Sequence, residues 1–250
     1  MKKFLLIILF LVSSRVLACD CDPPDITEKF VQSEFVADVT IIKIYPNEKN
    51  ERGYKADIKI NKLYKGEPLK SVHVYGRSDH KFQSSCDIFI PVDTQLIAYA
   101  RKNKNGNYGI GMCSGLLYLN GTTPQRKKRE VEILEMFKSK EIDFTDKISY
   151  REKGTLREKL DQFRGIKLKK NYGFYQITFS SDLEIKSVEQ ISGFGTPIDK
   201  NLMEILYTTE WTSSDKGIKD KVPENSKFLI GIYYYKAEKE NPGFLSQFYH

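Results

Sequence analysis

The sequence predicts a mostly β protein with helices, in which a five-stranded barrel is followed by a smaller α+β unit. Three observations support this fold class. Apolar and polar residues alternate through most of the first half, whereas the longer stretches with helical spacing appear only after about residue 121. All four cysteines lie in the first half. The chain of 250 residues has the length of one large domain or two ordinary domains.

Residues 1–18, with the sequence MKKFLLIILFLVSSRVLA, are predicted to be a signal peptide. Two lysines precede nine apolar residues, and Val16-Leu17-Ala18 fits the small-residue cleavage pattern. The apolar run is shorter than the ~20 residues that span a bilayer, and polar residues end it early, which disfavours an uncleaved anchor helix. Cleavage after Ala18 would leave a mature chain of 232 residues that begins at Cys19.

We therefore expect an exported protein, periplasmic or secreted, with no transmembrane segment in the mature chain, because no later segment is apolar enough to cross a membrane. The MKK start and the Lys/Ile/Tyr-rich composition are typical of a bacterial protein. The formal charge of +7 falls to +4 when the three basic residues of the signal leave. Basic residues are spread among acidic ones, which indicates a solvated surface, and export further argues against nucleic acid as a partner.

The cysteines predict disulfides, because an even number in an exported protein is typical of a disulfide framework. They are Cys19, Cys21, Cys86 and Cys113. A bond between Cys19 and Cys21 is disfavoured by geometry, so each is expected to reach Cys86 or Cys113. A zinc site of all four cysteines is the alternative, but the CxC spacing, the lack of a second close pair and the oxidising compartment disfavour it. We expect neither a metal nor a cofactor.

Residues 19–121 contain the five predicted strands of the barrel, separated by the turn-forming segments PNEKNERG, GEP and KNKNGN. One short helix, with Asp25 as its N-cap and Ile26 and Phe30 on one face, is expected to pack across the strands. Five such strands with one helix predict a small closed barrel of the OB type. The strand sequences are SEFVADVTIIKIYP, GYKADIKINKLYKGE, KSVHVYG, DTQLIAYARK and GNYGIGMCSG.

Residues 122–149 are predicted to be a helical linker, in which Thr123 caps the helix and Pro124 takes its first position. Apolar residues follow near helical spacing up to Phe137. The basic cluster Arg126–Arg129 is interpreted as the solvated face of this helix, with an anion-binding patch as the alternative.

Residues 150–250 are predicted to form a small antiparallel sheet with a helix on one side. The last strand is expected at an exposed edge, where a partner's β-strand could pair with it. The segments, in order, are a helix in TLREKLDQFRG, strands in YGFYQITFSS and LEIKSVEQISG, a helix in IDKNLMEILYTTEW, and a strand in KFLIGIYYYKAE.

The stretch CDCDPPDITEKFVQSEFVADV resembles the amino terminus of the tissue inhibitors of metalloproteinases. In that family a CxC pair is followed by a Pro-Pro corner, a helix with a phenylalanine, and a Ser-acid-aliphatic entry to the first strand. The segment Tyr64-Lys65-Gly66 is similar to the family's strand end, and the resemblance covers residues 19–119. It implies an OB-like fold with the disulfides Cys19–Cys86 and Cys21–Cys113. The matching residues at the start are Cys19, Cys21, Pro23, Pro24, Phe30, Ser33, Glu34 and Val36.

The resemblance also implies a mechanism. In these inhibitors the α-amine and carbonyl of the first cysteine, here Cys19, chelate the catalytic zinc of the target enzyme, and the next side chain, here Asp20, enters the specificity pocket. The family has a small uncharged hydroxyl residue at the Asp20 position, a further cysteine at the Val31 position, and a disulfide-rich second half that is absent here. A carboxylate buried in an apolar pocket costs several kcal/mol unless it is paired.

From Tyr172 to Tyr235 the chain resembles the carboxy-terminal domain of TonB-type envelope proteins. The resemblance lies in the segments GFYQITFSSDLEIKSVEQISG, IDKNLMEIL and VPENSKFLIGIYY, with Trp211 between the last two. Trp211 is interpreted as a packing residue, with ligand binding as the alternative.

Enzymatic activity is not expected, and no catalytic residue is assigned, because His73, His80 and His250 show no metal-ligand spacing and no nucleophile motif. The sequence predicts a non-enzymatic binding protein with a protein partner, a candidate inhibitor of a zinc metalloproteinase through Cys19. The alternatives are a non-inhibitory module of the cell envelope and a lipoprotein acylated at Cys19, because Val16–Cys19 loosely fits a lipobox.

Overall fold

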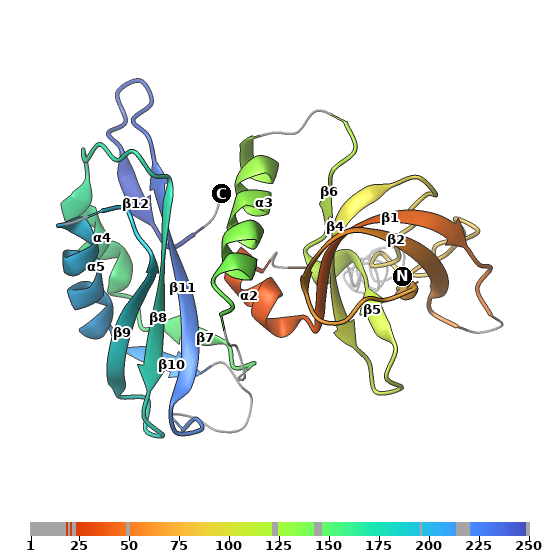
Figure 1. Cartoon of the computed structure of the whole chain (residues 1–250), viewed down its shortest axis with the longest axis horizontal. Coiled ribbons are helices and arrows are strands. Elements are labelled where there is room, and N and C mark those ends of the chain that lie inside the picture. The colour runs from red at the N-terminus through yellow and green to blue at the C-terminus, as the bar shows by residue number, and fades with distance from the viewer. Residues whose placement is uncertain are drawn as a thin grey trace, which may run out of the picture. The chain divides into compact units, whose positions relative to one another are not determined.

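The computed structural model describes residues 19, 21, 24–48, 51–121, 125–142, 147–195, 197–213 and 221–248 (Figure 1). The predicted signal peptide and Asp20 lie outside these residues. The chain divides into two compact units, here called the barrel unit, Met1–Pro24 with Ser33–Thr123, and the sheet unit, Asp25–Gln32 with Pro124–His250. Among the described residues, no helix has both the length and the apolar character that a membrane crossing requires.

The barrel unit is a closed five-stranded barrel with the strand order β1-β2-β3-β5-β4, in which β4 pairs back with β1. All pairings are antiparallel except the parallel pair β3–β5. This OB-like architecture confirms the five strands predicted from alternation, and the two-residue strand β6 adds to the edge of β4. The strands are β1 Phe35–Ile44, β2 Tyr54–Lys65, β3 Ser71–Val74, β4 Gln95–Lys102, β5 Tyr108–Ile110 and β6 Leu117–Tyr118.

The barrel core consists of the inward-facing half of each alternating strand. In β1 these residues are Phe35, Ala37, Val39 and Ile41, all fully buried. Tyr54 on β2 is 1% exposed, and its hydroxyl oxygen accepts a hydrogen bond from the backbone N–H of Ile90 at 2.8 Å. The phenol therefore fills the core and also satisfies a buried backbone donor.

The short helix α2, Ile26–Gln32, belongs to the sheet unit, whereas the sequence predicted it as part of the barrel domain. Its apolar face meets α3, Gln125–Ser139, where the ring centroids of Phe30 and Phe137 lie 4.9 Å apart. Beside them, Lys29 forms an ion pair with Glu130 at 2.5 Å, and the two side chains are only 8% and 3% exposed. The helix packs here because α3 offers both an apolar stripe and a buried acid that matches Lys29.

The sheet unit contains a four-stranded antiparallel sheet with the order β12-β11-β8-β9. The last predicted strand, β11, is not the outermost strand where β12 pairs with it, from Tyr233 to Tyr235. On its other side it pairs with β8 from Ser226 to Tyr233. A separate two-stranded ribbon pairs β7 with β10. The elements are β7 Tyr150–Glu152, α4 Leu156–Leu160, the 3-10 helix η2 Asp161–Phe163, β8 Tyr172–Phe179, β9 Ile185–Ser192, α5 Ile198–Tyr207, β10 Trp211–Ser213, β11 Ser226–Tyr235 and β12 Phe244–Ser246.

Both faces of this sheet are covered, whereas the sequence predicted a helix on one side only. Tyr175 and Ile177 of β8 lie in one core with residues of α4 and α5. On the opposite face, Phe174 packs against Phe137 of α3 and Tyr233 of β11. Its ring centroid lies 5.0 Å from that of Phe137 and 6.0 Å from that of Tyr233. Figure 1 shows α4 and α5 on one side of the sheet and α2 and α3 on the other. The segment predicted as a linker thus supplies a packed helix of the sheet unit.

Two buried side chains fix the helix side of the sheet. Asp199, in the first turn of α5, is 1% exposed and accepts hydrogen bonds from the Tyr175 hydroxyl at 2.6 Å and from the backbone N–H of Phe194 at 2.8 Å. Burial and this carboxylate raise the pKa of Tyr175. A Cβ atom at Gly193 would lie 2.5 Å from the Asp199 carboxyl, so the close approach requires glycine. Trp211 is 4% exposed and packs edge-on against Phe228, with the two ring centroids 5.0 Å apart. This confirms its predicted packing role.

Replacing Glu130 with alanine should lower the free energy of unfolding by about 3 kcal/mol or more, because it removes the carboxylate from the buried Lys29 ammonium. The double variant Lys29→Met/Glu130→Leu should lose less than about 2 kcal/mol, since it removes both charges. Urea unfolding followed by circular dichroism measures both. Glu132→Ala, at an exposed position of the same helix, is the control. A Glu130→Ala loss no larger than that of the control would contradict this account.

Stability should also fall at high pH, because burial raises the pKa of Tyr54 from 10.0 to about 12. The folded barrel holds this proton more tightly than the unfolded chain, so the contribution is complete below pH 10 and is lost as the pH rises from 10 toward 12. Tyr54→Phe should lose about 1 kcal/mol at neutral pH through the missing acceptor for Ile90. Above pH 10, the free energy of unfolding of this variant should fall less steeply with pH than that of the unchanged protein.

Urea unfolding at several pH values tests this, with the exposed Tyr75→Phe as the control. If the free energy of unfolding falls equally steeply above pH 10 in the Tyr54→Phe variant and the unchanged protein, Tyr54 is not the group responsible for the loss of stability.

Candidate functional site: the disulfide-anchored amino-terminal segment

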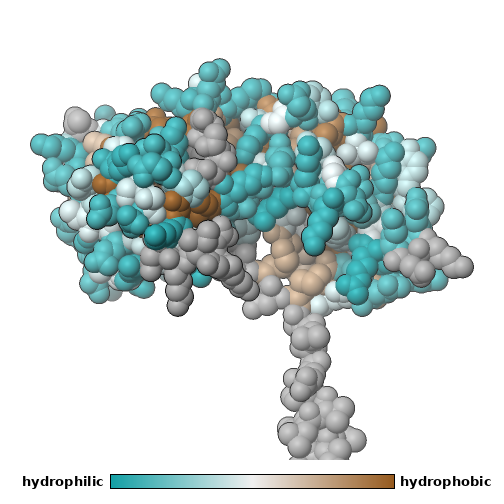
Figure 2. Space-filling view, turned by 90° about the horizontal axis from the view of Figure 1, so that it is seen from below, coloured by the Kyte–Doolittle hydropathy of each residue, from teal (hydrophilic) through white to brown (hydrophobic). Residues whose placement is uncertain are grey.

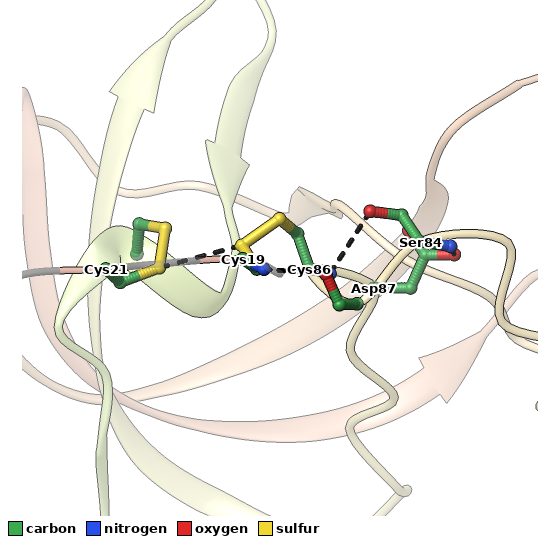
Figure 3. Close-up of a disulfide and its surroundings, with 7 residues drawn as sticks. Cys19, Cys21, Ser84, Cys86 and Asp87 are labelled. Atoms are coloured by element: carbon green, nitrogen blue, oxygen red, sulfur yellow. Dashed lines mark hydrogen bonds between the residues drawn. A yellow bond between two sulfur atoms is a disulfide. The ribbon is translucent and has the colours of Figure 1, made fainter. Parts of the chain in front are cut away.

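Two disulfides hold the segment from Cys19 to Cys21 against the barrel. Cys19 is bonded to Cys86 with their Cα atoms 5.2 Å apart, and Cys21 is bonded to Cys113 with their Cα atoms 5.3 Å apart. These are the pairs that the inhibitor resemblance implies. Figure 3 shows the Cys19–Cys86 bond beside Cys21 and the loop from Ser84 to Asp87.

The two partner cysteines follow the two parallel strands of the barrel. Cys86 lies in the loop after β3, and Cys113 lies in the 3-10 helix η1, Met112–Ser114, directly after β5. Because β3 and β5 run parallel, their carboxyl ends lie at the same end of the barrel. The amino-terminal segment is therefore attached at two points to one end of a closed barrel.

The loop that carries Cys86 is held by its own hydrogen bonds. The Asp87 carboxylate accepts the backbone N–H of Gln83 at 2.7 Å and of Ser84 at 3.1 Å, and the Ser84 hydroxyl accepts the N–H of Cys86 at 3.2 Å. Beyond the loop, Ile88 forms a bridge with Gly76, where an added Cβ would lie 1.9 Å from the Ile88 carbonyl oxygen. The anchor of Cys19 is thus a defined loop, although its surface is exposed.

The turn that carries Cys113 is similarly fixed. Ser114 accepts the backbone N–H of Gly111 through its hydroxyl at 2.9 Å and donates its own N–H to the Gly111 carbonyl at 3.1 Å. This reciprocal pair closes η1 and sets the position of Cys113. Local hydrogen bonds within the protein therefore fix both the loop that carries Cys86 and the turn that carries Cys113.

Ser85 is a site residue that the sequence did not predict. The backbone nitrogen of Cys19 donates a hydrogen bond to the Ser85 hydroxyl at 2.7 Å. Ser85 directly precedes Cys86 in the sequence, which is the one local sign of its place at the site.

The four sulfur atoms are close together but are not arranged as metal ligands. The Sγ atoms of Cys19 and Cys21 lie 3.9 Å apart, and those of Cys19, Cys21 and Cys113 all lie within 4.8 Å of one another. Each belongs to a disulfide and carries no thiolate to offer zinc. The four-cysteine zinc site weighed as an alternative is therefore not the arrangement in this structure.

Exposed apolar side chains occur in the same loops. Phe82, four residues before Cys86, is 53% exposed, and Met112, next to Cys113, is 48% exposed. Elsewhere the surface drawn in Figure 2 is mostly hydrophilic, with hydrophobic residues in small separate areas. These side chains give the anchored end of the barrel apolar surface that a protein partner could cover.

No family model matches this chain, and no curated protein matches it. Of the residues predicted for the site, the structure places Cys19, Cys21, Cys86 and Cys113 together. Asp20 lies outside the described residues. The inhibitor and TonB resemblances therefore rest on sequence features, to which the OB-like barrel and its two disulfides correspond only at the level of fold.

Removing the second disulfide should destabilise the barrel unit strongly. The double variant Cys21→Ala/Cys113→Ala opens a loop of 92 residues, and we expect the free energy of unfolding to fall by roughly 4 kcal/mol. Urea unfolding without reductant measures the loss, and mass spectrometry checks that Cys19–Cys86 still forms. The matched control is the unchanged protein under reducing conditions, which loses both bonds and should be less stable than the variant. A loss below about 1 kcal/mol would contradict the role of this bond as a staple.

Proposed function

We propose that this protein is an exported, disulfide-stabilised binding protein that inhibits a zinc metalloproteinase through the amino terminus at Cys19. The observation that carries the proposal is the attachment of Cys19 and Cys21, one residue apart, to the same end of the barrel by separate disulfides. A terminus fixed in this way loses little conformational freedom on binding, which favours affinity.

The chemistry of inhibition follows from a free Cys19 amine. After signal removal this α-amine would have a pKa of about 7.7 to 8.0, so part of it is neutral at physiological pH. A neutral amine and the adjacent carbonyl oxygen can replace the water on the catalytic zinc of a protease, whose fourth position is open. The hydrogen bond to Ser85 would orient the nitrogen toward the metal.

Asp20 would set the specificity of such an inhibitor. As the residue after the chelating cysteine, it would enter the pocket that an apolar or small side chain of a substrate normally occupies. The target enzyme should then have a basic group in this pocket, because an unpaired carboxylate in an apolar site costs several kcal/mol.

The test uses protein with Cys19 as its first residue, checked by mass spectrometry without reduction. Inhibition constants are measured against a panel of zinc metalloproteinases that includes enzymes with basic and with apolar specificity pockets. Adding one alanine before Cys19 should weaken inhibition by at least about 100-fold, because it moves the free amine away from the zinc. Asp20→Ser should strengthen inhibition of the enzymes with apolar pockets by about tenfold or more.

Asp182→Ser, in an exposed turn of the sheet unit, is the matched control and should leave every inhibition constant unchanged. Equal inhibition by the extended and the unextended protein would overturn the chelation mechanism. So would an acylated Cys19 in the exported protein.

The second candidate is a non-inhibitory cell-envelope module that binds proteins through the sheet unit. It is favoured by the order of strands, hairpin, helix and tryptophan that resembles the TonB-type domain. A partner strand would then pair with β9 or β12 at the sheet edges. The further alternative is lipidation of Cys19. It would take up the sulfur that bonds to Cys86, so Cys19 cannot be lipidated and disulfide-bonded at the same time.

A further inference from the structure

A pocket of about 370 Å³ lies in the sheet unit, remote in sequence from Cys19 and independent of the proposed inhibition. It is formed where the first turns of α3, the loop after η2, the end of β11 and the start of β12 come together. A volume of this size is in the range of pockets that hold small molecules.

The charged residues of the pocket are mostly basic. Arg129 from α3, Arg164 from the loop after η2 and Lys236 after β11 line it, and Glu238 is the one acidic residue among the lining side chains that the structure describes. Arg164 also forms an exposed ion pair with Asp161 at 2.9 Å. The described lining residues therefore carry a net charge of +2, which favours an anion.

One wall of the pocket is aromatic. The rings of Tyr235 and Phe244 are stacked with centroids 5.0 Å apart and planes 15° apart. The Arg129 guanidinium carbon lies 5.9 Å from the Tyr235 ring centroid, within the range of a cation–π contact. A guanidinium beside an aromatic face can bind an anionic group and a flat apolar group of the same ligand.

Hydrogen bonds hold the walls in place without a ligand. The Tyr234 hydroxyl donates to the Ile166 carbonyl at 2.9 Å, and the Gly165 N–H donates to the Gly243 carbonyl at 2.7 Å. These two bonds join the loop after η2 to the hairpin between β11 and β12. On the aromatic side, the Tyr235 hydroxyl donates to the Phe248 carbonyl at 2.9 Å, which fixes the ring. A preformed pocket loses less freedom on binding than a flexible surface does.

We propose that this pocket binds a small ligand in which a phosphate or a carboxylate is attached to a planar, apolar group. The anionic group lies between Arg129, Arg164 and Lys236, and the planar group lies against Tyr235 and Phe244. From the sequence, the basic cluster at the start of α3 is interpreted as a solvated face. In the proposed site, Arg129 of this cluster lines the binding pocket.

The test is a titration of the full mature protein with phenyl phosphate, followed by nuclear magnetic resonance of backbone and arginine side-chain N–H groups. We expect saturable shifts at Arg129 and Tyr235, with binding about fivefold tighter than that of inorganic phosphate, which lacks the ring. Benzoate in a parallel titration distinguishes the two anionic groups: tighter binding of benzoate identifies a carboxylate ligand, and tighter binding of phenyl phosphate identifies a phosphate ligand.

Two variants with opposite expected effects separate binding from structural damage. Arg129→Gln should weaken phenyl phosphate binding by about fivefold or more, whereas Glu238→Gln should strengthen it by about twofold. Arg157→Gln removes the same charge from an exposed position of α4 outside the pocket and should leave the dissociation constant unchanged.

The proposal is overturned if phenyl phosphate and inorganic phosphate bind equally. It is also overturned if Arg157→Gln weakens binding as much as Arg129→Gln, because either result indicates a non-specific attraction of anions to a basic surface. These measurements do not involve inhibition of a metalloproteinase, so their outcome tests the pocket proposal independently of the inhibitor proposal.

Discussion

The arrangement at the candidate site depends on the covalent attachment of Cys19 and Cys21 to a closed barrel. Segments near the ends of a domain are usually held by few contacts. Here the bonds Cys19–Cys86 and Cys21–Cys113 join the segment to residues 67 and 92 positions further along the chain. The barrel supplies a rigid base, because its closure through the β1–β4 pairing leaves β1–β5 no open edge. The chemistry proposed for Cys19 would require a free α-amine in addition to this fixed position.

The helix α2 gives the chain a discontinuous organisation. It lies in the sheet unit, while the residues on both sides of it in the sequence, up to Pro24 and from Ser33, belong to the barrel unit. Its buried Lys29 and Phe30 depend on partners about a hundred residues away in α3. Cutting the chain after residue 121 would therefore not release an intact barrel domain alone, because the apolar face of α2 would lose the helix that covers it. In this respect the chain departs from the expected organisation, in which this helix belongs to the barrel domain.

Sequence reasoning predicted the elements with strong local patterns and missed features that depend on distant partners. Alternation identified β1 to β5, and periodicity identified α3 and α5, because each pattern extends over several residues. The strands β6, β7, β10 and β12 have two or three residues each, too few for a pattern. The apolar face of α2 was visible in Ile26 and Phe30, but periodicity does not say what covers a face. At the site, spacing left two cysteine pairings open, and only the family resemblance chose between them. Ser85 and the pocket around Arg129 are brought together by tertiary structure from segments with no shared motif.

The two long disulfide loops also have a consequence for the order of events during biosynthesis. A chain is made from its amino terminus, so Cys19 and Cys21 appear early, but their partners are added only 67 and 92 residues later. Cys113 lies in the turn η1, which follows β5, the last of the five barrel strands in the sequence. The first cysteines to be synthesised therefore cannot form their final bonds until Cys86 and Cys113 have been added, and until then both thiols are open to incorrect partners. A thiol–disulfide isomerase in the compartment of folding would act on this segment above all others.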